Sequence, residues 1–241
     1  MCMNQRISDF TKSPPPASRW YWLIRKILVR PAHSPACEGG STLTASRCLI
    51  LAALLLALVL VAGCTENKER KDIKISGRPY KGTANASVAV VEFSDFECPY
   101  CREAVATEQY LLDKYAGKIK IVFKQFPLVN IHIDSMQAAQ ASECAHEQGK
   151  FWEYHNMLFD NQQRLADADL KSYAGYIGLD SDRFDACLDS GIKEAIVLAD
   201  LNEGGRIGVR GTPTFFVNGI QVSSPERKNV DKAVAGELAN K

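Results

Sequence analysis

Two cysteines separated by a proline and a tyrosine, Cys98 and Cys101, are the residues whose types and spacing point most directly to chemistry. The β-branched run at residues 87–91 predicts a buried strand before them, and residues 102–115 carry apolar side chains at helical spacing. Cys98 is therefore expected at the start of a helix, where unpaired N–H groups and the helix dipole favour a thiolate. A thiolate with a second thiol one turn away can attack a disulfide and be resolved by its neighbour. The spacing thus predicts a redox-active Cys98–Cys101 pair.

Glu92 lies six residues before Cys98, on the strand that leads into the cysteine pair. A carboxylate buried beneath a dithiol can relay the proton that the resolving cysteine must lose. We therefore include Glu92 among the candidate catalytic residues. The alternative is an acidic residue at the solvated end of a strand, which is the usual environment of glutamate.

The same C-x-x-C spacing also occurs in structural zinc sites. The sequence has no second C-x-x-C, so that Cys144, Cys187 and His146 are the residues left to complete such a site. The change from strand to helix around Cys98 favours the redox interpretation. We predict no metal site and no bound cofactor, because a dithiol is itself the electron carrier.

Two segments resemble a known family. Residues 90–101, VVEFSDFECPYC, resemble the active-site segment of DsbA-like members of the thioredoxin superfamily. Residues 208–219, GVRGTPTFFVNG, resemble the loop that carries a cis-proline in that superfamily, followed by a strand and a turn. The resemblance implies that Pro213 is cis and faces the dithiol, and that Thr212 binds the substrate chain through its backbone. It also implies an α/β fold with a thioredoxin-like central mixed sheet and an inserted α-helical domain.

The N-terminal part has the features of an export signal. Residues 48–63 are an uninterrupted run of apolar and small residues, too short for a typical membrane span but suited to a signal peptide. The run ends in LVAGC at Cys64, which resembles the lipobox of bacterial lipoproteins and implies lipidation of Cys64 after cleavage. An uncleaved anchor helix and a plain signal peptide are the alternatives. Residues 1–40 contain several prolines and fit poorly before a signal, so translation is expected to start after Met1 or the signal has a long basic region.

The resulting domain organisation has five parts. They are an N-terminal extension with a lipoprotein signal peptide at 1–63, the lipid-attachment cysteine, tether and edge strand at 64–86, the first thioredoxin-like part at 87–130, the helical insert at 131–204, and the second thioredoxin-like part at 205–241. Within this plan we expect the edge strand near Ile73, followed by a turn over residues 79–85. The last insert helix is expected over 192–204 and the final helix over 225–239, with Pro225 near its first position.

The insert supplies two further predictions. Cys144 and Cys187 lie on different predicted helices, and an oxidising compartment favours a disulfide between them. Such a bond would close a loop of about 43 residues and contribute about 3–4 kcal/mol, with two buried free thiols as the alternative. The aromatic residues of 151–159 are interpreted as core between helices, with a ligand groove as the alternative.

Charge and length limit the remaining function classes. Residues 65–241 carry 22 basic and 26 acidic side chains, which gives no indication of nucleic-acid binding. The resemblance implies a monomeric thiol:disulfide oxidoreductase in the bacterial cell envelope, held outside the cytoplasm by a lipid anchor. Its partners would be exported proteins with thiols or disulfides and a membrane redox partner that recycles the dithiol.

The direction of exchange is left open by the sequence. Tyr100 stands where the strongest oxidants of the family have histidine, so a mild oxidase is expected, with a reductase or isomerase as the alternative. A hypothesis from another class is a membrane-tethered protein that holds unfolded clients on the aromatic face of residues 151–159.

Overall fold

The computed structural model describes residues 69–240. All of them belong to the unit Glu66–Lys241, which is distinct from a unit at Met1–Thr65. The predicted extension, signal peptide and lipid-attachment residue Cys64 therefore lie outside the described residues. Among the helices that are described, none combines the length and the apolar character that crossing a bilayer requires.

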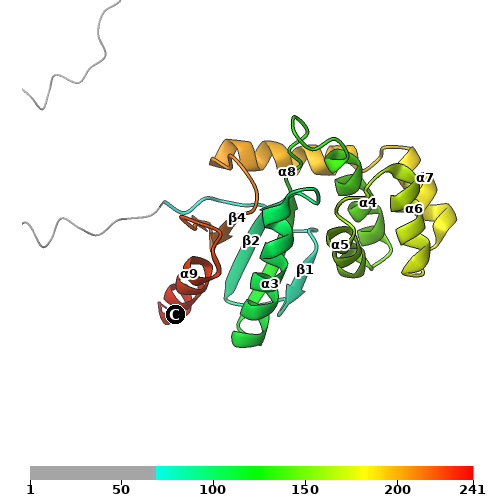
Figure 1. The fold of residues 1–241 in the computed structure, drawn as a ribbon. Helices are drawn as coiled ribbons and strands as arrows, with labels where there is room; N and C mark the ends of the chain where they lie inside the picture. The colour runs from blue at the N-terminus through cyan, green and yellow to red at the C-terminus, as the bar shows by residue number, and fades with distance from the viewer. Residues whose placement is uncertain (1–68, 241) are drawn as a thin grey trace, which may run out of the picture. The chain divides into compact units, whose positions relative to one another are not determined.

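A five-stranded mixed sheet forms the centre of the unit (Figure 1). Its strands, in the order β1-β3-β2-β4-β5, are β1 (Tyr80–Gly82), β3 (Ile119–Gln125), β2 (Val88–Ser94), β4 (Thr214–Val217) and β5 (Ile220–Gln221). Strands β2 and β3 run parallel, whereas β1 pairs antiparallel with β3, and β4 pairs antiparallel with β2. The predicted thioredoxin-like mixed sheet is confirmed.

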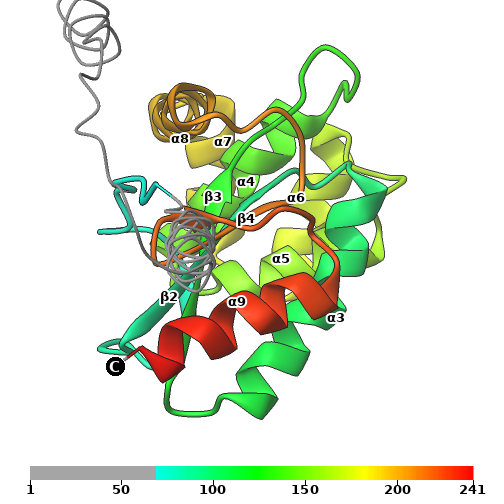
Figure 2. The ribbon, with the colours of Figure 1, turned by 90° about the vertical axis from the view of Figure 1, so that its left-hand side faces the viewer.

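Helices cover both faces of this sheet. Helix α3 (Pro99–Lys114) connects β2 to the parallel strand β3, and it packs beside the last helix, α9 (Arg227–Ala239), on one face. Helix α8 (Glu194–Ile207) lies against the other face, where Ile207 packs with residues of β2, β3 and β4. Figure 2 shows α3 and α9 together on one side of the strands and α8 on the other. Because β2 is covered on both faces, its side chains are nearly all buried.

The insert between β3 and β4 is helical, as predicted. It contains α8 and four shorter helices, α4 (Ser135–Glu147), α5 (Phe151–Asp160), α6 (Asp167–Tyr176) and α7 (Ser181–Asp189). A disulfide between Cys144 and Cys187 joins α4 to α7, with Cα atoms 5.9 Å apart. These two cysteines are therefore not available as metal ligands, which removes two of the three residues that the zinc alternative required.

The aromatic face of α5 is core, as the sequence analysis favoured. Phe151, Tyr154, Leu158 and Phe159 are all buried, and only Trp152 is partly exposed. The hypothesis of a holding protein relied on this face, and burial removes most of the surface that clients would contact.

The expected edge strand near Ile73 is wrong in position. The edge strand is β1, in the range that the sequence analysis assigned to a turn, and it pairs Tyr80 with Val122 of β3. Residues around Ile73 have no regular structure; Ile73 and Ile75 instead pack on the face of the sheet that α8 covers. Two apolar side chains two residues apart can pack in this way without joining the ladder.

Two helix boundaries also differ from expectation. Helix α8 continues through Gly204 to Ile207, and the chain turns at Gly208, whose φ of 99° is accessible mainly to glycine. Gly204 belongs inside the helix because of close packing, since a Cβ atom there would lie 2.7 Å from ring carbons of Phe126. At the C-terminal end, Glu226 is the N-cap of α9, so Pro225 precedes the helix and does not begin it.

Candidate functional site

The fold brings three separate segments to one point. Strand β2 ends at Ser94 just before the cysteine pair, and helix α3 begins at Pro99 just after Cys98. Strand β4 begins beside them, because it pairs antiparallel with β2 so that Thr214 lies opposite Phe93. The loop before β4 therefore faces the start of α3. Its Thr212–Pro213 peptide bond is cis.

Cys98 occupies the N-cap position of α3, with Pro99 following it. Its carbonyl oxygen accepts hydrogen bonds from the backbone N–H groups of Cys101 at 3.0 Å and Arg102 at 3.3 Å. Its Sγ donates to the carbonyl oxygen of Thr212 at 3.3 Å. Cys98 and Cys101 are both free thiols, and both are buried. The structure thus holds the pair in the dithiol form, in contact with the cis-proline loop.

The two thiols have very different acidities. A hydrogen bond from the Cys101 thiol, helped by the Thr212 side chain and the backbone N–H groups of Tyr100 and Cys101, lowers the pKa of Cys98 to about 6, although burial opposes this. Burial raises the pKa of Cys101 well above its ordinary value, and the neighbouring Cys98 and Glu92 raise it further. At neutral pH, Cys98 is therefore a thiolate and Cys101 a thiol, which is the division of roles that disulfide exchange requires.

Thr212 contacts Cys98 in both of its protonation states. The Thr212 carbonyl oxygen accepts a hydrogen bond from the thiol. The Thr212 hydroxyl is buried with no hydrogen-bond partner in the dithiol form, and as a donor to the thiolate it lowers the pKa of Cys98. The sequence placed Thr212 in the site as a substrate-binding residue, and the structure adds this contact with the sulfur.

Glu92 is buried, with 1% of its surface exposed, so the alternative of a solvated strand end is wrong. In the sheet it lies between Phe123 of β3 and Phe215 of β4. Burial raises the pKa of Glu92 well above its ordinary value, and the carboxyl group of Glu108 on α3 adds to the effect. The negative charge of the Glu92 carboxylate raises the pKa of Cys101, so the two groups interact electrostatically.

Sequence reasoning missed two residues that hold the loop before Cys98, namely Gln162 and Asp95. The side-chain amide of Gln162, in the turn after α5, donates to the carbonyl oxygens of Phe96 and Cys98, both at 2.8 Å. The carboxylate of Asp95 accepts from the backbone N–H groups of Glu97 and Leu128 and lies 2.8 Å from Nδ1 of His132. Asp95 belongs to the motif and could have been found; nothing near Gln162 in the sequence indicates its role.

An open groove of about 900 Å³ lies between α3 and α9, and its lining includes Tyr100, between the two cysteines in sequence, and the cis-proline Pro213. It begins at Tyr100 and Pro213, continues past Thr107 and Tyr110, and ends at Arg227 and Asp231. Tyr100 is 68% exposed at its entrance.

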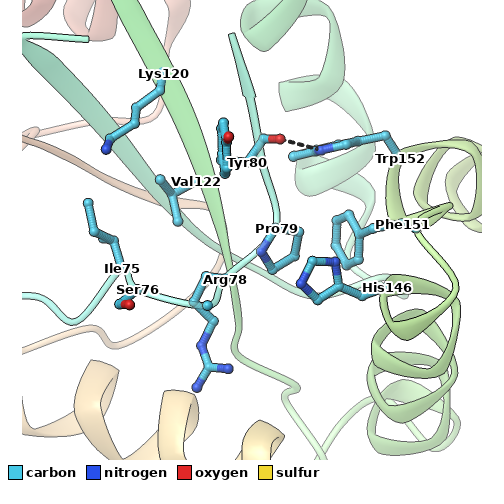
Figure 3. Close-up of a pocket in the computed structure, with 12 residues that line it drawn as sticks. Ile75, Ser76, Arg78, Pro79, Tyr80, Lys120, Val122, His146, Phe151 and Trp152 are labelled. Carbon is cyan, nitrogen blue, oxygen red and sulfur yellow. Dashed lines mark hydrogen bonds between the residues drawn. The ribbon is translucent and has the colours of Figure 1, made fainter. Parts of the chain in front are cut away.

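A second pocket of about 730 Å³ lies at the opposite part of the sheet, beside the edge strand β1 (Figure 3). Tyr80, Val122, Phe151 and Trp152 contribute to its wall, and the Trp152 Nε1 donates to the carbonyl oxygen of Tyr80 at 2.8 Å. None of its lining residues belongs to the dithiol site. Residues 69–240 contain no cluster of three or more histidine, cysteine or acidic side chains arranged to hold a metal ion.

Comparison with known proteins gives a match over most of the described unit. The family model described as Thioredoxin matches residues 75–235. The structure of BdbD from Bacillus subtilis, in its oxidised form, has a TM-score of 0.66 and 22% identity, covering 72% of this chain and all of that one. A thioredoxin-like oxidoreductase from Silicibacter pomeroyi has a TM-score of 0.61 and 28% identity, covering 67% of this chain and 92% of that one.

Curated relatives by sequence are longer proteins. The Na(+)/H(+) antiporter NhaA 3 of Salinispora tropica is 41% identical over 145 residues, which is 60% of this chain. NhaA 1 of Salinispora arenicola is 41% identical over 139 residues. The match spans 22% of the first antiporter and 21% of the second, so it concerns one segment of those proteins.

Proposed function

The chain belongs to the thioredoxin family and has the fold of DsbA-like thiol–disulfide oxidoreductases, and on this premise we propose that it exchanges disulfides with exported proteins. The observation that carries the proposal is the contrast between its two thiols, with a pKa of about 6 for Cys98 and a raised pKa for Cys101. A nucleophile that is ionised at neutral pH beside a protonated resolving thiol is suited to this chemistry.

In the oxidising direction, a client thiolate attacks Sγ of Cys98 in the Cys98–Cys101 disulfide. The client–Cys98 bond forms, the Cys98–Cys101 bond breaks, and Cys101 leaves as a thiolate that takes up a proton. A second client thiolate then attacks the client sulfur of this mixed disulfide and releases Cys98 as a thiolate. The client gains a disulfide, and the two electrons remain on the enzyme as a dithiol.

Glu92 is the group assigned to the proton of Cys101, because it is buried and acts electrostatically on that thiol. Thr212 and Pro213 present the client chain, since the Thr212 carbonyl already contacts the sulfur of Cys98. The groove between α3 and α9 accepts the residues of the client next to its cysteine.

We assign the protein the role of a mild oxidase. Stabilisation of the Cys98 thiolate favours the reduced enzyme, which makes the disulfide more oxidising, but Tyr100 supplies no imidazolium to strengthen the effect. A disulfide reductase or isomerase uses the same atoms in the other direction. Thiol-trapping mass shifts in cells separate these roles, because an oxidase keeps the pair mostly as disulfide and a reductase keeps it mostly as dithiol.

We further propose that the protein works in the bacterial cell envelope as a monomer, anchored by lipid on Cys64, with a membrane redox partner that recycles the dithiol. The LVAGC sequence supports the anchor, and the Cys144–Cys187 disulfide is compatible with an oxidising compartment. Mass spectrometry of the mature N-terminus tests the anchor; a mass that retains residues before Cys64 would contradict it.

The central experiment replaces Cys98 by serine and measures insulin-disulfide reduction and oxidative refolding of a reduced client. Both activities should be lost. The matched control replaces Cys144 and Cys187 together by alanine, which removes two cysteines outside the site and should leave exchange intact. Unchanged activity of Cys98→Ser would show that the dithiol is incidental.

A further inference from the structure

A buried charged cluster lies behind the dithiol, on the α3 face of the sheet. Glu108 lies seven residues after Cys101 on α3, and its side chain is 1% exposed. Its Oε2 is 2.5 Å from Nζ of Lys81 on β1, and this Nζ lies 4.3 Å from the centre of the Trp152 ring. A buried carboxylate is costly unless it is paired, and this one is paired with an ammonium that is 21% exposed at the sheet edge.

Glu108 also contacts Glu92. The two carboxyl groups, one on α3 and one on β2, are close enough for each to act on the pKa of the other as a hydrogen-bond partner. A carboxylate has no hydrogen to donate, so this contact requires one proton between the two groups. Two adjacent buried carboxyl groups do not both ionise readily, and the environment decides which of them keeps the proton.

The surroundings place the proton on Glu92. Burial and the negative charge of Glu108 raise the pKa of Glu92. Burial opposes ionisation of Glu108 as well, but its positively charged neighbours outweigh this, and the pKa of Glu108 is lowered. Lys81 forms its ion pair with Glu108, whereas it acts on Glu92 only through its charge, so it favours the charged form of Glu108 over that of Glu92.

Few other polar groups face the two carboxyl groups of Glu92 and Glu108. Cys101 on α3 and the Ser94 hydroxyl on β2 lie on the side of the dithiol, and the strand neighbours Phe123 and Phe215 are apolar. His155 on α5 also faces Glu108 and has the largest effect among the groups that lower the pKa of Glu108, although burial lowers the pKa of His155 itself to about 4. Lys81 is the cation in direct contact with the pair, through its ion pair with Glu108.

We propose that Glu108 and Lys81 are positioning residues that keep the shared proton on Glu92, where it is available for transfer to Cys101. The inference rests on the proposed function and adds two residues to it. When a client thiolate opens the disulfide, Cys101 leaves as a thiolate and Glu92 gives it the proton. Glu92 is then a carboxylate next to the Glu108 carboxylate, and this repulsion favours recovery of a proton from solvent before the next turnover.

The test measures the rate at which reduced glutathione opens the Cys98–Cys101 disulfide, from pH 5 to 9, corrected for the fraction of glutathione thiolate. The rate should fall as Glu92 loses its proton. In Glu108→Gln the neighbouring negative charge is gone, so this fall should move to lower pH by about one unit. In Lys81→Met a positive charge is gone, so it should move to higher pH. Glu153→Gln, the same change at an exposed position of α5, is the control and should show no shift.

Opposite shifts in the two variants are the expected result. No shift, or shifts in the same direction, in proteins that still exchange disulfides would overturn the inference and leave the proposed function standing. Because Glu108→Gln removes one partner of a buried ion pair and can fail to fold, a second measurement uses the wild-type protein. The infrared band of a protonated carboxyl group should be present at pH 7 and absent in Glu92→Gln; its absence from the wild type would refute the proposal.

Discussion

The side-chain amide of Gln162 donates a 2.8 Å hydrogen bond to the carbonyl oxygen of Cys98, although 64 residues separate the two. The same amide bonds the carbonyl oxygen of Phe96 at 2.8 Å. These bonds fix the loop before α3 to the helical insert. The insert therefore contributes to holding the nucleophilic cysteine in place.

Replacing Gln162 by alanine should leave both carbonyl oxygens without this partner in a buried place. We expect the free energy of unfolding to fall by about 1–3 kcal/mol, measured by urea denaturation of the dithiol form. Gln163→Ala is the matched control, because the neighbouring Gln163 is exposed. Equal stability of the two variants would mean that the bonds from Gln162 contribute little to holding the loop.

The Thr212 hydroxyl should control the acidity of the nucleophile. Thr212→Val keeps the shape of the side chain but removes the donor that stabilises the Cys98 thiolate, so the pKa of Cys98 should rise above about 6. Ultraviolet absorbance of the thiolate, titrated with pH, measures this value directly. Thr212→Ser retains the hydroxyl and should restore the low pKa; a serine variant that titrates like the valine variant would contradict the assignment.

The same low pKa makes stability depend on pH. Cys98 has a pKa of about 6 in the folded dithiol form and about 9 when unfolded, so between these values the unfolded chain binds more protons. Its contribution to stability is fully present above pH 9 and is lost as pH falls through 6. From pH 6.5 to 8.5 the dithiol form should therefore gain stability with slope up to about 1.4 kcal/mol per pH unit.

The comparison for this effect is Cys98→Ala, which lacks the titrating thiol. Urea denaturation of both proteins under reducing conditions should give free energies of unfolding that diverge as pH rises within this window. Parallel curves would show that the folded environment does not stabilise the thiolate.

Much of this architecture could be predicted from local sequence patterns. The strand before Cys98 and the helix after it follow from hydrophobic periodicity, and these elements are confirmed. The edge strand could not be placed correctly, because Tyr80, Lys81 and Gly82 have no strand pattern of their own. They become a strand through backbone pairing with β3, while the more apolar residues near Ile73 are used for packing.

The residues of the site also fall into two groups, those that the sequence predicts and those that only the structure reveals. Cys98, Cys101, Glu92 and Thr212 lie in recognisable segments, and the structure brings them together. Gln162 and Glu108 could not be assigned from sequence, because their roles arise from the packing of α3 and of the turn after α5 against the site. A buried glutamate on a helix looks like a surface residue until the tertiary contacts are known.

Helix α8 offers a test of packing that does not involve the dithiol. An added Cβ at Gly204 would lie 2.7 Å from ring carbons of Phe126 and 3.0 Å from Phe93, whereas one at Gly205 would meet nothing within 4 Å. Gly204→Ala should therefore force α8 away from the sheet and cost about 1–3 kcal/mol of unfolding free energy. Gly205→Ala adds the same methyl group one residue later, and its better helix propensity should stabilise the protein by up to about 1 kcal/mol. Thermal and urea denaturation of the two variants measure the difference. A Gly204→Ala protein as stable as Gly205→Ala would mean that α8 does not pack as closely on the sheet as Phe126 and Gly204 indicate.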